Sequence, residues 1–376
     1  MTVKTNVELL NMMTLAQARR ARLAAAMATR GIDVMVLYGN AWQGDYLRYA
    51  ADFGILEGHG VAIVSSDGAT ELHLDSVTEA ERAEAEVPGA VVCFDADISG
   101  AVATRLVRLR KARMAAAPWR LLPSALVRDN RGFALEDGTA LIDQLLMHKL
   151  PTEIDAVRRS AALADDAYAA FRAAVRAGRA QYEIVAEIEG ALRAAGCPDN
   201  FMIMGSGGKD VLGMTPASKR RIAPGDLVTT ELTPAVEGYF VQICRTLVVG
   251  GASEPQRRAF AVFREALEAG IAAVRPGATA ADVARAENEV FRRHGLGDYT
   301  TSKWTRVRGH GLGLFCDGKP HLLEDVTTPL APGMTLIVHP NTYHPEAGYI
   351  VLGDAVVVTD TGAEVLTKTP RELFEV

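Results

Sequence analysis

Residues 225–246, GDLVTTELTPAVEGYFVQICRT, decide the fold of the second half of this chain. Two apolar runs rich in β-branched and aromatic residues, 227–232 and 239–246, flank a glycine-containing turn at 236–238, and this pattern predicts a β-hairpin. A turn centred between Val236 and Glu237 places Glu231 directly opposite Gln242, on the same face of the hairpin. The alternative is an ordinary surface pair, because a slip of one residue moves one of the two side chains to the other face.

Three further clusters follow the hairpin, and each combines glycine or proline with a functional side chain. Residues 308–314 have the sequence Arg-Gly-His-Gly-Leu-Gly-Leu, where alternating glycines allow close backbone approach around His310. Residues 332–340 place His339 at the end of an apolar strand, and residues 348–354 form another strand that ends in Gly353 and Asp354. A lone histidine is more often structural, but among glycines beside a strand-rich tail we favour a functional role.

The segments around these clusters predict an α+β domain over residues 150–376. Apolar periodicity predicts long helices at about 153–177, 181–195, 254–274 and 280–293, and the tail from 335 to 366 alternates strands with turns. Thr152 and Thr279 are the expected N-caps of the first and last of these helices. Helix pairs that alternate with hairpins indicate the α+β class.

Residues 1–149 predict a separate α/β domain. A helix over 16–30, closed by Gly31, is followed by a buried strand at 34–38 and by a strand at 60–64 that pairs with residues 71–74. A helix over 77–86 and a strand at 90–94 repeat the alternation. Strands that alternate with helices are typical of an α/β fold, and a length of 376 residues makes two domains the expected number.

Composition and charge exclude several classes of protein. Hydrophobic residues make up 49% of the chain and charged residues 23%, as in soluble globular proteins. A net charge of −6, without a basic stripe, gives no reason to expect nucleic acid as a partner. No apolar stretch approaches the ~20 residues that span a bilayer and no signal peptide is evident, so we expect no membrane partner. The four cysteines are scattered without a CxxC pair, and the expected location is cytoplasmic.

The order of the four clusters resembles the pita-bread fold family, which includes methionine aminopeptidase, aminopeptidase P, prolidase and creatinase. The similarity covers about residue 149 to the C-terminus, and the first domain resembles the one carried by aminopeptidase P, prolidase and creatinase. The resemblance implies a creatinase/prolidase-type α/β domain over residues 1–149, a pita-bread domain over residues 150–376, and a homodimer. The Gly-His-Gly motif is weak by itself, whereas the ordered set of clusters is specific for the fold.

At its chemical site the chain departs from that family. The metal-dependent members hold two divalent ions with two aspartates of the hairpin, the histidine of Gly-His-Gly and two glutamates of the last strands. By resemblance these five positions fall, in order, on Glu231, Gln242, His310, His339 and Gly353. Two cations a few ångström apart need anionic bridging ligands, which an amide and a glycine do not supply. We therefore expect neither a two-metal centre nor another cofactor.

The remaining residues suffice for acid–base chemistry, and they predict a metal-independent, creatinase-like hydrolase that acts on a C–N bond of a small polar molecule. We expect His310 or His339 to be the base. Glu231 would orient or charge-balance it, holding one histidine as imidazolium, and Gln242 would bind a substrate carbonyl or amide. The expected substrate-binding residues are Asp317, which stands where the metallopeptidases have a further histidine, together with Lys319, His321, Cys244 and Tyr343.

Three alternatives stay open from the sequence. The first is an Xaa-Pro-type peptidase with a single metal ion on Glu231, His310 and His339, a possible two-histidine, one-carboxylate set. The second is a lyase or decarboxylase that uses the same groups on a small molecule. The third is a non-catalytic binding protein, against which stands the cost of keeping a carboxylate and two imidazoles buried together.

Overall fold

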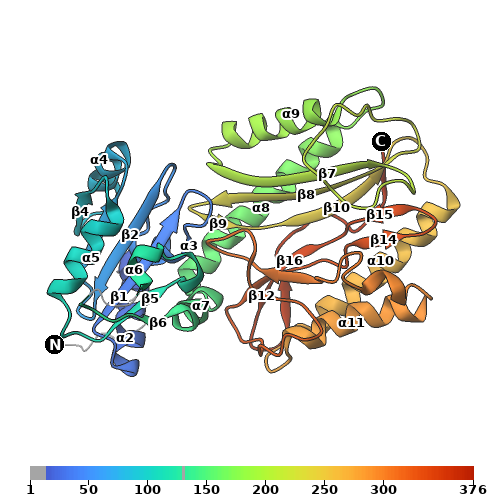
Figure 1. The fold of residues 1–376 in the computed structure, drawn as a ribbon. Helices are drawn as coiled ribbons and strands as arrows, with labels where there is room; N and C mark the ends of the chain where they lie inside the picture. The colour runs from blue at the N-terminus through green and yellow to red at the C-terminus, as the bar shows by residue number, and fades with distance from the viewer. Residues whose placement is uncertain (1–13, 129–131) are drawn as a thin grey trace, which may run out of the picture. The chain divides into compact units, whose positions relative to one another are not determined.

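The computed structural model describes residues 14–128 and 132–376, which fold as two compact units that divide between Leu146 and Met147 (Figure 1). Within these residues, no helix is both long and apolar enough to cross a bilayer. The first unit is built on a six-stranded mixed sheet in the order β4-β3-β2-β1-β5-β6. Its strands are β1 (Val34–Asn40), β2 (His59–Ser65), β3 (Thr70–Leu74), β4 (Ala90–Phe94), β5 (Met114–Ala117) and β6 (Glu136–Asp137).

Two helices of the first unit, α2 (Leu15–Arg30) and α4 (Val77–Glu86), were predicted from the sequence, and the unit contains further helices that were not. These further helices are α3 (Asp45–Ala51), α5 (Ile98–Arg108), the short η1 (Trp119–Leu121) and α6 (Ser124–Val127), and α7 (Thr139–Met147) runs across the division. Helix α2 ends where it was expected to, because Gly31 adopts a left-handed φ of 64° and its N–H bonds the carbonyls of Ala28 and Met27. The prediction of an α/β fold for this half is confirmed.

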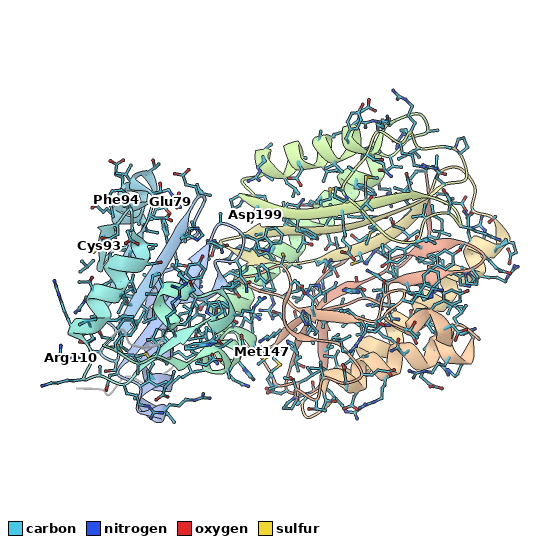
Figure 2. All side chains as sticks on the ribbon, viewed as in Figure 1. Glu79, Cys93, Phe94, Arg110, Met147 and Asp199 are labelled. Carbon is cyan, nitrogen blue, oxygen red and sulfur yellow. The ribbon has the colours of Figure 1, made fainter. Side chains whose placement is uncertain are left out.

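Burial in this sheet depends on the position of each strand. Strand β1 pairs with β2 on one side and β5 on the other, and its residues from Val34 to Gly39 are all buried. Strand β4 lies at the edge, where Val91 is 61% exposed and Phe94 is 51% exposed (Figure 2). An edge strand has only one neighbour, so the central strands carry the core.

The second unit contains two five-stranded sheets and a hairpin. One sheet has the order β18-β10-β8-β7 with β9 attached to β8, the other has the order β12-β11-β13-β16-β17, and β14 pairs with β15. The strands of the first sheet are β7 (Asp199–Gly207), β8 (Leu227–Val236), β9 (Tyr239–Phe240), β10 (Ile243–Val248) and β18 (Phe374–Glu375). The others are β11 (Gly309–Gly311), β12 (Gly318–His321), β13 (Thr335–Val338), β14 (Thr342–His344), β15 (Gly348–Ile350), β16 (Asp354–Val358) and β17 (Ala363–Val365).

Each of these sheets is covered by its own pair of helices (Figure 1). Helices α8 (Pro151–Ala174) and α9 (Gln181–Ala194) share a core with β8 and β10, in which Phe171 and Ile188 pack near Val228. Helices α10 (Glu254–Ala273) and α11 (Ala280–Arg293) share a second core with β13 and β16, and the short η2 (Gly297–Thr300) follows α11. The α+β prediction for this half is confirmed, with two helix pairs and two sheets.

Helix caps match the sequence at one of the two expected positions. Thr279 caps α11, because its side chain accepts the N–H of Asp282. The prediction of Thr152 as the cap of α8 is wrong. That helix begins at Pro151, which suits the first helical position, and the Glu153 carboxylate accepts the N–H of Leu150 at 2.7 Å.

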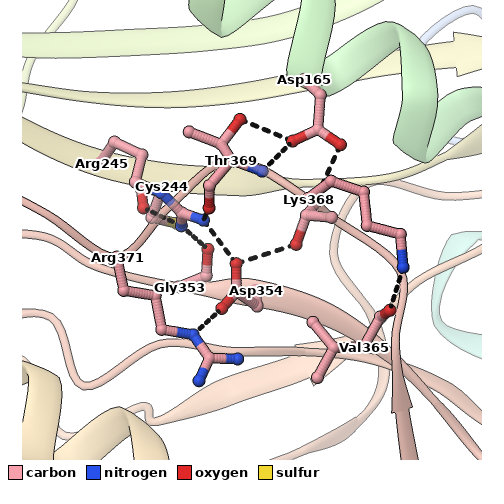
Figure 3. Close-up of polar contacts among 10 residues, drawn as sticks. Asp165, Cys244, Arg245, Gly353, Asp354, Val365, Lys368, Thr369 and Arg371 are labelled. Atoms are coloured by element: carbon pink, nitrogen blue, oxygen red, sulfur yellow. Dashed lines mark hydrogen bonds and ion pairs between the residues drawn. The ribbon is translucent and has the colours of Figure 1, made fainter.

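A buried ion pair joins β10 to β16 and holds the C-terminal segment (Figure 3). Arg245 is fully buried and donates from Nη2 to Asp354 Oδ1 at 2.6 Å. Asp354 also accepts Thr367 Oγ1 at 2.8 Å and Arg371 Nε at 2.5 Å. Burial alone would raise the pKa of Asp354, but the charges and hydrogen bonds of Arg245 and Arg371 lower it, so the ion pair is charged at neutral pH.

Replacement of Asp354 with Asn should destabilise the protein by about 3–5 kcal/mol, because it leaves the buried Arg245 guanidinium without a counter-charge. The control is Glu364→Gln, since Glu364 pairs with Arg158 at 2.9 Å on the surface and should contribute less than about 1 kcal/mol. Urea unfolding followed by circular dichroism measures both. An Asp354→Asn variant as stable as the control would show that the ion pair does not hold the fold.

Candidate active site

The hairpin β8–β9–β10 has a different register from the one expected. Glu237 and Gly238 both have positive φ, 52° and 81°, as a two-residue hairpin turn with this twist requires. Glu231 therefore pairs with Cys244, and the prediction that it lies directly opposite Gln242 is wrong. The turn lies one residue further along the chain, which shifts the pairing by two residues and keeps Gln242 on the Glu231 face. The Gln242 side chain still hydrogen-bonds the Glu231 carboxyl, from a diagonal position.

Glu231 is a carboxyl group surrounded by neutral partners. Asn341 Nδ2 donates to Glu231 Oε1 at 2.7 Å, and the side chains of Cys244 and Gln242 also hydrogen-bond the carboxyl. Because desolvation outweighs these bonds, the pKa of Glu231 is raised to about 7. A carboxyl group with this pKa can exchange protons at neutral pH, which is the property of a general acid or base.

The two histidines come together on the neighbouring sheet. His310 lies on β11 and His339 follows β13, and their rings are 5.5 Å apart, edge to face. His310 donates from Nδ1 to the carbonyl of Gly311 at 3.0 Å, which leaves its Nε2 as an acceptor, and His339 Nδ1 is buried without a hydrogen-bond partner in the described part of the chain.

Both imidazoles are neutral. Burial lowers the pKa of His310, and it lowers the pKa of His339 to about 3, with the nearby His310 as the second cause. The expectation that Glu231 would hold one of them as imidazolium is therefore wrong. Desolvation decides the charge state of all three groups, and it favours the neutral form of each.

The predicted substrate-binding residues divide into two groups. Asp317 Oδ1 lies 3.0 Å from His321 Nε2 and 3.8 Å from His310 Nδ1, so Asp317 and His321 stand next to the histidine of the site. Lys319 is exposed on β12, between these two residues in sequence. Cys244 is completely buried against Glu231, and burial holds the pKa of its thiol well above the usual range, so it is no nucleophile.

The Tyr343 side chain contacts Trp304 and Lys209 and has no hydrogen bond to the other predicted site residues among the described contacts. It stacks on Trp304 with ring centroids 4.7 Å apart, and its hydroxyl donates to the carbonyl of Lys209 at 3.0 Å. Its cross-strand partner Tyr349 is the tyrosine that interacts electrostatically with Glu231, and the Tyr349 hydroxyl is 3.0 Å from Thr305 Oγ1.

Sequence reasoning missed Asn341 and Tyr349. Asn341 is part of the run His-Pro-Asn-Thr-Tyr at 339–343, and an amide two residues beyond a strand-end histidine was the available signal. Tyr349 belongs to the apolar strand at 348–354, where alternation gives no sign that its hydroxyl matters.

Gly353 forms a close backbone contact between the two sheets. Its backbone exchanges two hydrogen bonds with Cys244, of 3.2 and 2.9 Å. A Cβ atom on Gly353 would lie 2.6 Å from the Cβ of His339 and 2.9 Å from the carbonyl oxygen of Val338. The site therefore has no room for a side chain at this position.

The donor set does not fit the metal ions that the resemblance implies. Gln242 offers a neutral amide, Gly353 offers no side chain, and one oxygen of Glu231 is taken by Asn341. Residues 14–128 and 132–376 contain no group of three or more His, Cys, Asp or Glu side chains placed to hold a metal ion, and this includes the set Glu231, His310 and His339. Two cations without bridging anions would repel each other strongly.

Comparison with known proteins gives a consistent family. The sequence model of metallopeptidase family M24 matches residues 155–360, more than half of the chain. An Xaa-Pro dipeptidase from Pyrococcus furiosus is 32% identical over 236 residues, which cover 62% of this chain and 67% of that protein.

Solved structures are similar over both units. An Xaa-Pro dipeptidase from Bacillus anthracis superposes with a TM-score of 0.80 at 28% identity, over 96% of this chain and 100% of that one. An X-Pro aminopeptidase from Thermotoga maritima MSB8 has a TM-score of 0.85 at 22% identity, over 95% and 99% of the two chains, which is a likeness of fold. These similarities confirm the pita-bread fold with its N-terminal α/β domain.

Replacement of Gly353 with Ala should destabilise the protein by about 1–3 kcal/mol, because the new Cβ overlaps the Cβ of His339. The matched control is Gly251→Ala, since no atom lies within 4 Å of a Cβ at Gly251. Thermal unfolding of the two variants beside the wild type measures the difference. Equal stability of both variants would contradict the close packing at Gly353.

Proposed function

This chain belongs to metallopeptidase family M24, and from that premise we propose its function. We propose that it hydrolyses the C–N bond of a small Xaa-Pro-type dipeptide and that its own side chains supply the acid–base catalysis. Membership of this family makes the chain a hydrolase of C–N bonds. The Xaa-Pro substrate class is proposed because Xaa-Pro dipeptidases recur among its relatives. These relatives support the Xaa-Pro peptidase class of the single-metal alternative over the creatinase-like hydrolase that the site residues suggested. The metal-free chemistry proposed here is a departure from that alternative and rests on the site residues alone.

The observation that carries the proposed mechanism is the state of Glu231. Its carboxyl group has a pKa of about 7 and is held in place by the Asn341 amide. A base is most effective when its pKa lies near the working pH, so Glu231 is the better base, and the two histidines have pKa values below their usual range. The sequence suggested His310 or His339 as the base and Glu231 as the residue that orients it, whereas here Glu231 is the base.

The proposed reaction consumes one water molecule and uses the Glu231 carboxylate as the only proton acceptor. Ionised Glu231 accepts a proton from water as the water oxygen bonds to the scissile carbonyl carbon. The tetrahedral intermediate collapses as the C–N bond breaks, and the leaving nitrogen takes up the proton from Glu231. The products are a carboxylic acid and an amine, and Glu231 returns to its starting state.

The neutral side chains position the substrate in this proposal. Gln242 is 3% exposed and its Oε1 has no hydrogen-bond partner among the described residues, so it can accept an N–H of the substrate. His339 has an unpartnered Nδ1, and as a neutral imidazole it can donate to the carbonyl oxygen on which negative charge develops. The hydrogen bond from His310 to the carbonyl of Gly311 fixes the orientation of the His310 ring.

Location and assembly remain proposals that rest on the sequence. We propose a cytoplasmic homodimer. The four free cysteines fit a reducing compartment, and the resemblance to the aminopeptidase P, prolidase and creatinase branch implies a dimer. Gel filtration with light scattering tests the dimer.

Glu231→Gln should lower kcat/KM for Ala-Pro by at least about 100-fold, because a neutral amide cannot accept a proton from water. In the wild type, kcat/KM should rise with pH through about 7 and then level, since the active form of Glu231 is the ionised one. Glu237→Gln is the matched control, an exposed glutamate of the same hairpin that pairs with Arg159. The rate of proline release, measured between pH 5 and 9 for the wild type and both variants, tests both expectations.

Three results would reject the proposed function. If the Glu231→Gln variant keeps the activity of the control, Glu231 is not the base. A rate that falls as pH rises through 7 would assign catalysis to a protonated group. A wild type that releases no proline from any Xaa-Pro dipeptide would favour the non-catalytic binding protein.

A further inference from the structure

Both polar atoms of the Asn341 side-chain amide are held by hydrogen bonds. Its Nδ2 donates to Glu231 Oε1 at 2.7 Å, and its Oδ1 accepts the backbone N–H of Leu352 at 3.0 Å. The residue is 1% exposed, so water does not compete for either bond. The amide cannot turn over, because the reversed orientation would place an oxygen against the carboxylate and an NH2 group against the Leu352 N–H.

The backbone of Asn341 is fixed as well. Its carbonyl oxygen accepts Arg308 Nη1 at 3.0 Å, and its N–H donates to the carbonyl of His339 at 2.7 Å. Arg308 is itself completely buried and donates from Nε to Asn288 Oδ1, on α11, at 2.5 Å. The position of the amide beside Glu231 is therefore set by both helix α11 and the segment between β15 and β16 that contains Leu352.

The Asn341 amide stands where a buried carboxylate would otherwise need a cation. A buried carboxylate needs donors or a cation, and the neighbours that hydrogen-bond Glu231 are the neutral side chains of Asn341, Cys244 and Gln242. A divalent ion would bind a carboxylate oxygen at about 2.1 Å along the direction of a lone pair. The Asn341 NH2 group already occupies one oxygen of Glu231.

We propose that Asn341 is a positioning residue that takes the place of a cation: its amide holds Glu231 for the reaction and closes this carboxylate to divalent metal ions. Its part in the reaction rests on the proposed function, whereas the exclusion of metal ions does not. The neutral donor satisfies the carboxylate with a hydrogen bond and needs no bridging anions around it. This accounts for a site that works without the carboxylates that two metal ions need.

The test is to give the site a second carboxylate and to measure metal binding directly. Asn341→Asp replaces the donor by an anion beside Glu231, and two adjacent carboxylates form an attractive site for a divalent ion. We expect this variant to bind Mn2+ with a Kd below about 100 µM, seen as loss of the free-ion signal in electron paramagnetic resonance. The wild type should leave the signal unchanged.

A matched control is available in the same unit. Asn200 also donates from Nδ2 to a glutamate, Glu189, at 2.7 Å, and neither residue belongs to the candidate site. Asn200→Asp should therefore leave the Mn2+ signal unchanged. The proposal is overturned if the wild type binds Mn2+ as tightly as Asn341→Asp, or if a folded Asn341→Asp variant binds none.

A second variant covers the case in which Asn341→Asp does not fold. Asn341→Ala removes the donor without adding charge, and we expect kcat for Ala-Pro to fall at least about tenfold while KM stays within about threefold. A role in folding alone would leave kcat of the folded fraction unchanged, and that result would overturn the positioning role. If the wild type does not hydrolyse Ala-Pro, the proposed function fails, and the Mn2+ measurements still decide whether Asn341 excludes the metal.

Discussion

The two hydrogen bonds between Cys244 and Gly353 bring strands β10 and β16 into contact, and the site depends on this contact. One residue further along each strand, Arg245 and Asp354 form a buried ion pair that holds the strands together from the other side. The contact is possible because residue 353 has no side chain, since a Cβ there would overlap His339. The ion pair stands on one side of this contact, and the side chains that hydrogen-bond Glu231 on the other side are all neutral.

Burial and neutral hydrogen-bond partners determine the chemistry of the site. Burial raises the pKa of Glu231 to about 7, because its hydrogen-bond partners are two amides and a thiol, which only partly offset the desolvation of the carboxylate. The same burial keeps His310 and His339 uncharged. Desolvation therefore sets the ionisation of all three groups, and the outcome is a titrating carboxyl group and two neutral imidazoles.

The sequence predicted the elements better than the contacts between them. Strand and helix positions followed from apolar periodicity, and Gly31 and Thr279 ended and began helices where expected. The hairpin register was wrong by two residues, because the positive φ of Glu237 is set by the twist of the strands and has no composition signal. The structure brings Glu231, Gln242 and Cys244 together and directs Tyr343 elsewhere, and the charge states could not be predicted because burial comes from tertiary packing. Asn341 was missed for the same reason, as its role appears only when residues 110 positions apart, Glu231 and Asn341, meet.

The central claim is that this site works through Glu231 without a two-metal centre. The most direct measurement is the rate of Ala-Pro hydrolysis and the metal content of the same samples, before and after dialysis against a chelator. The account predicts full activity with fewer than about 0.1 divalent ions per chain, because Glu231 alone activates the water. Activity that disappears with the metal, and returns only when two divalent ions bind each chain, would contradict it.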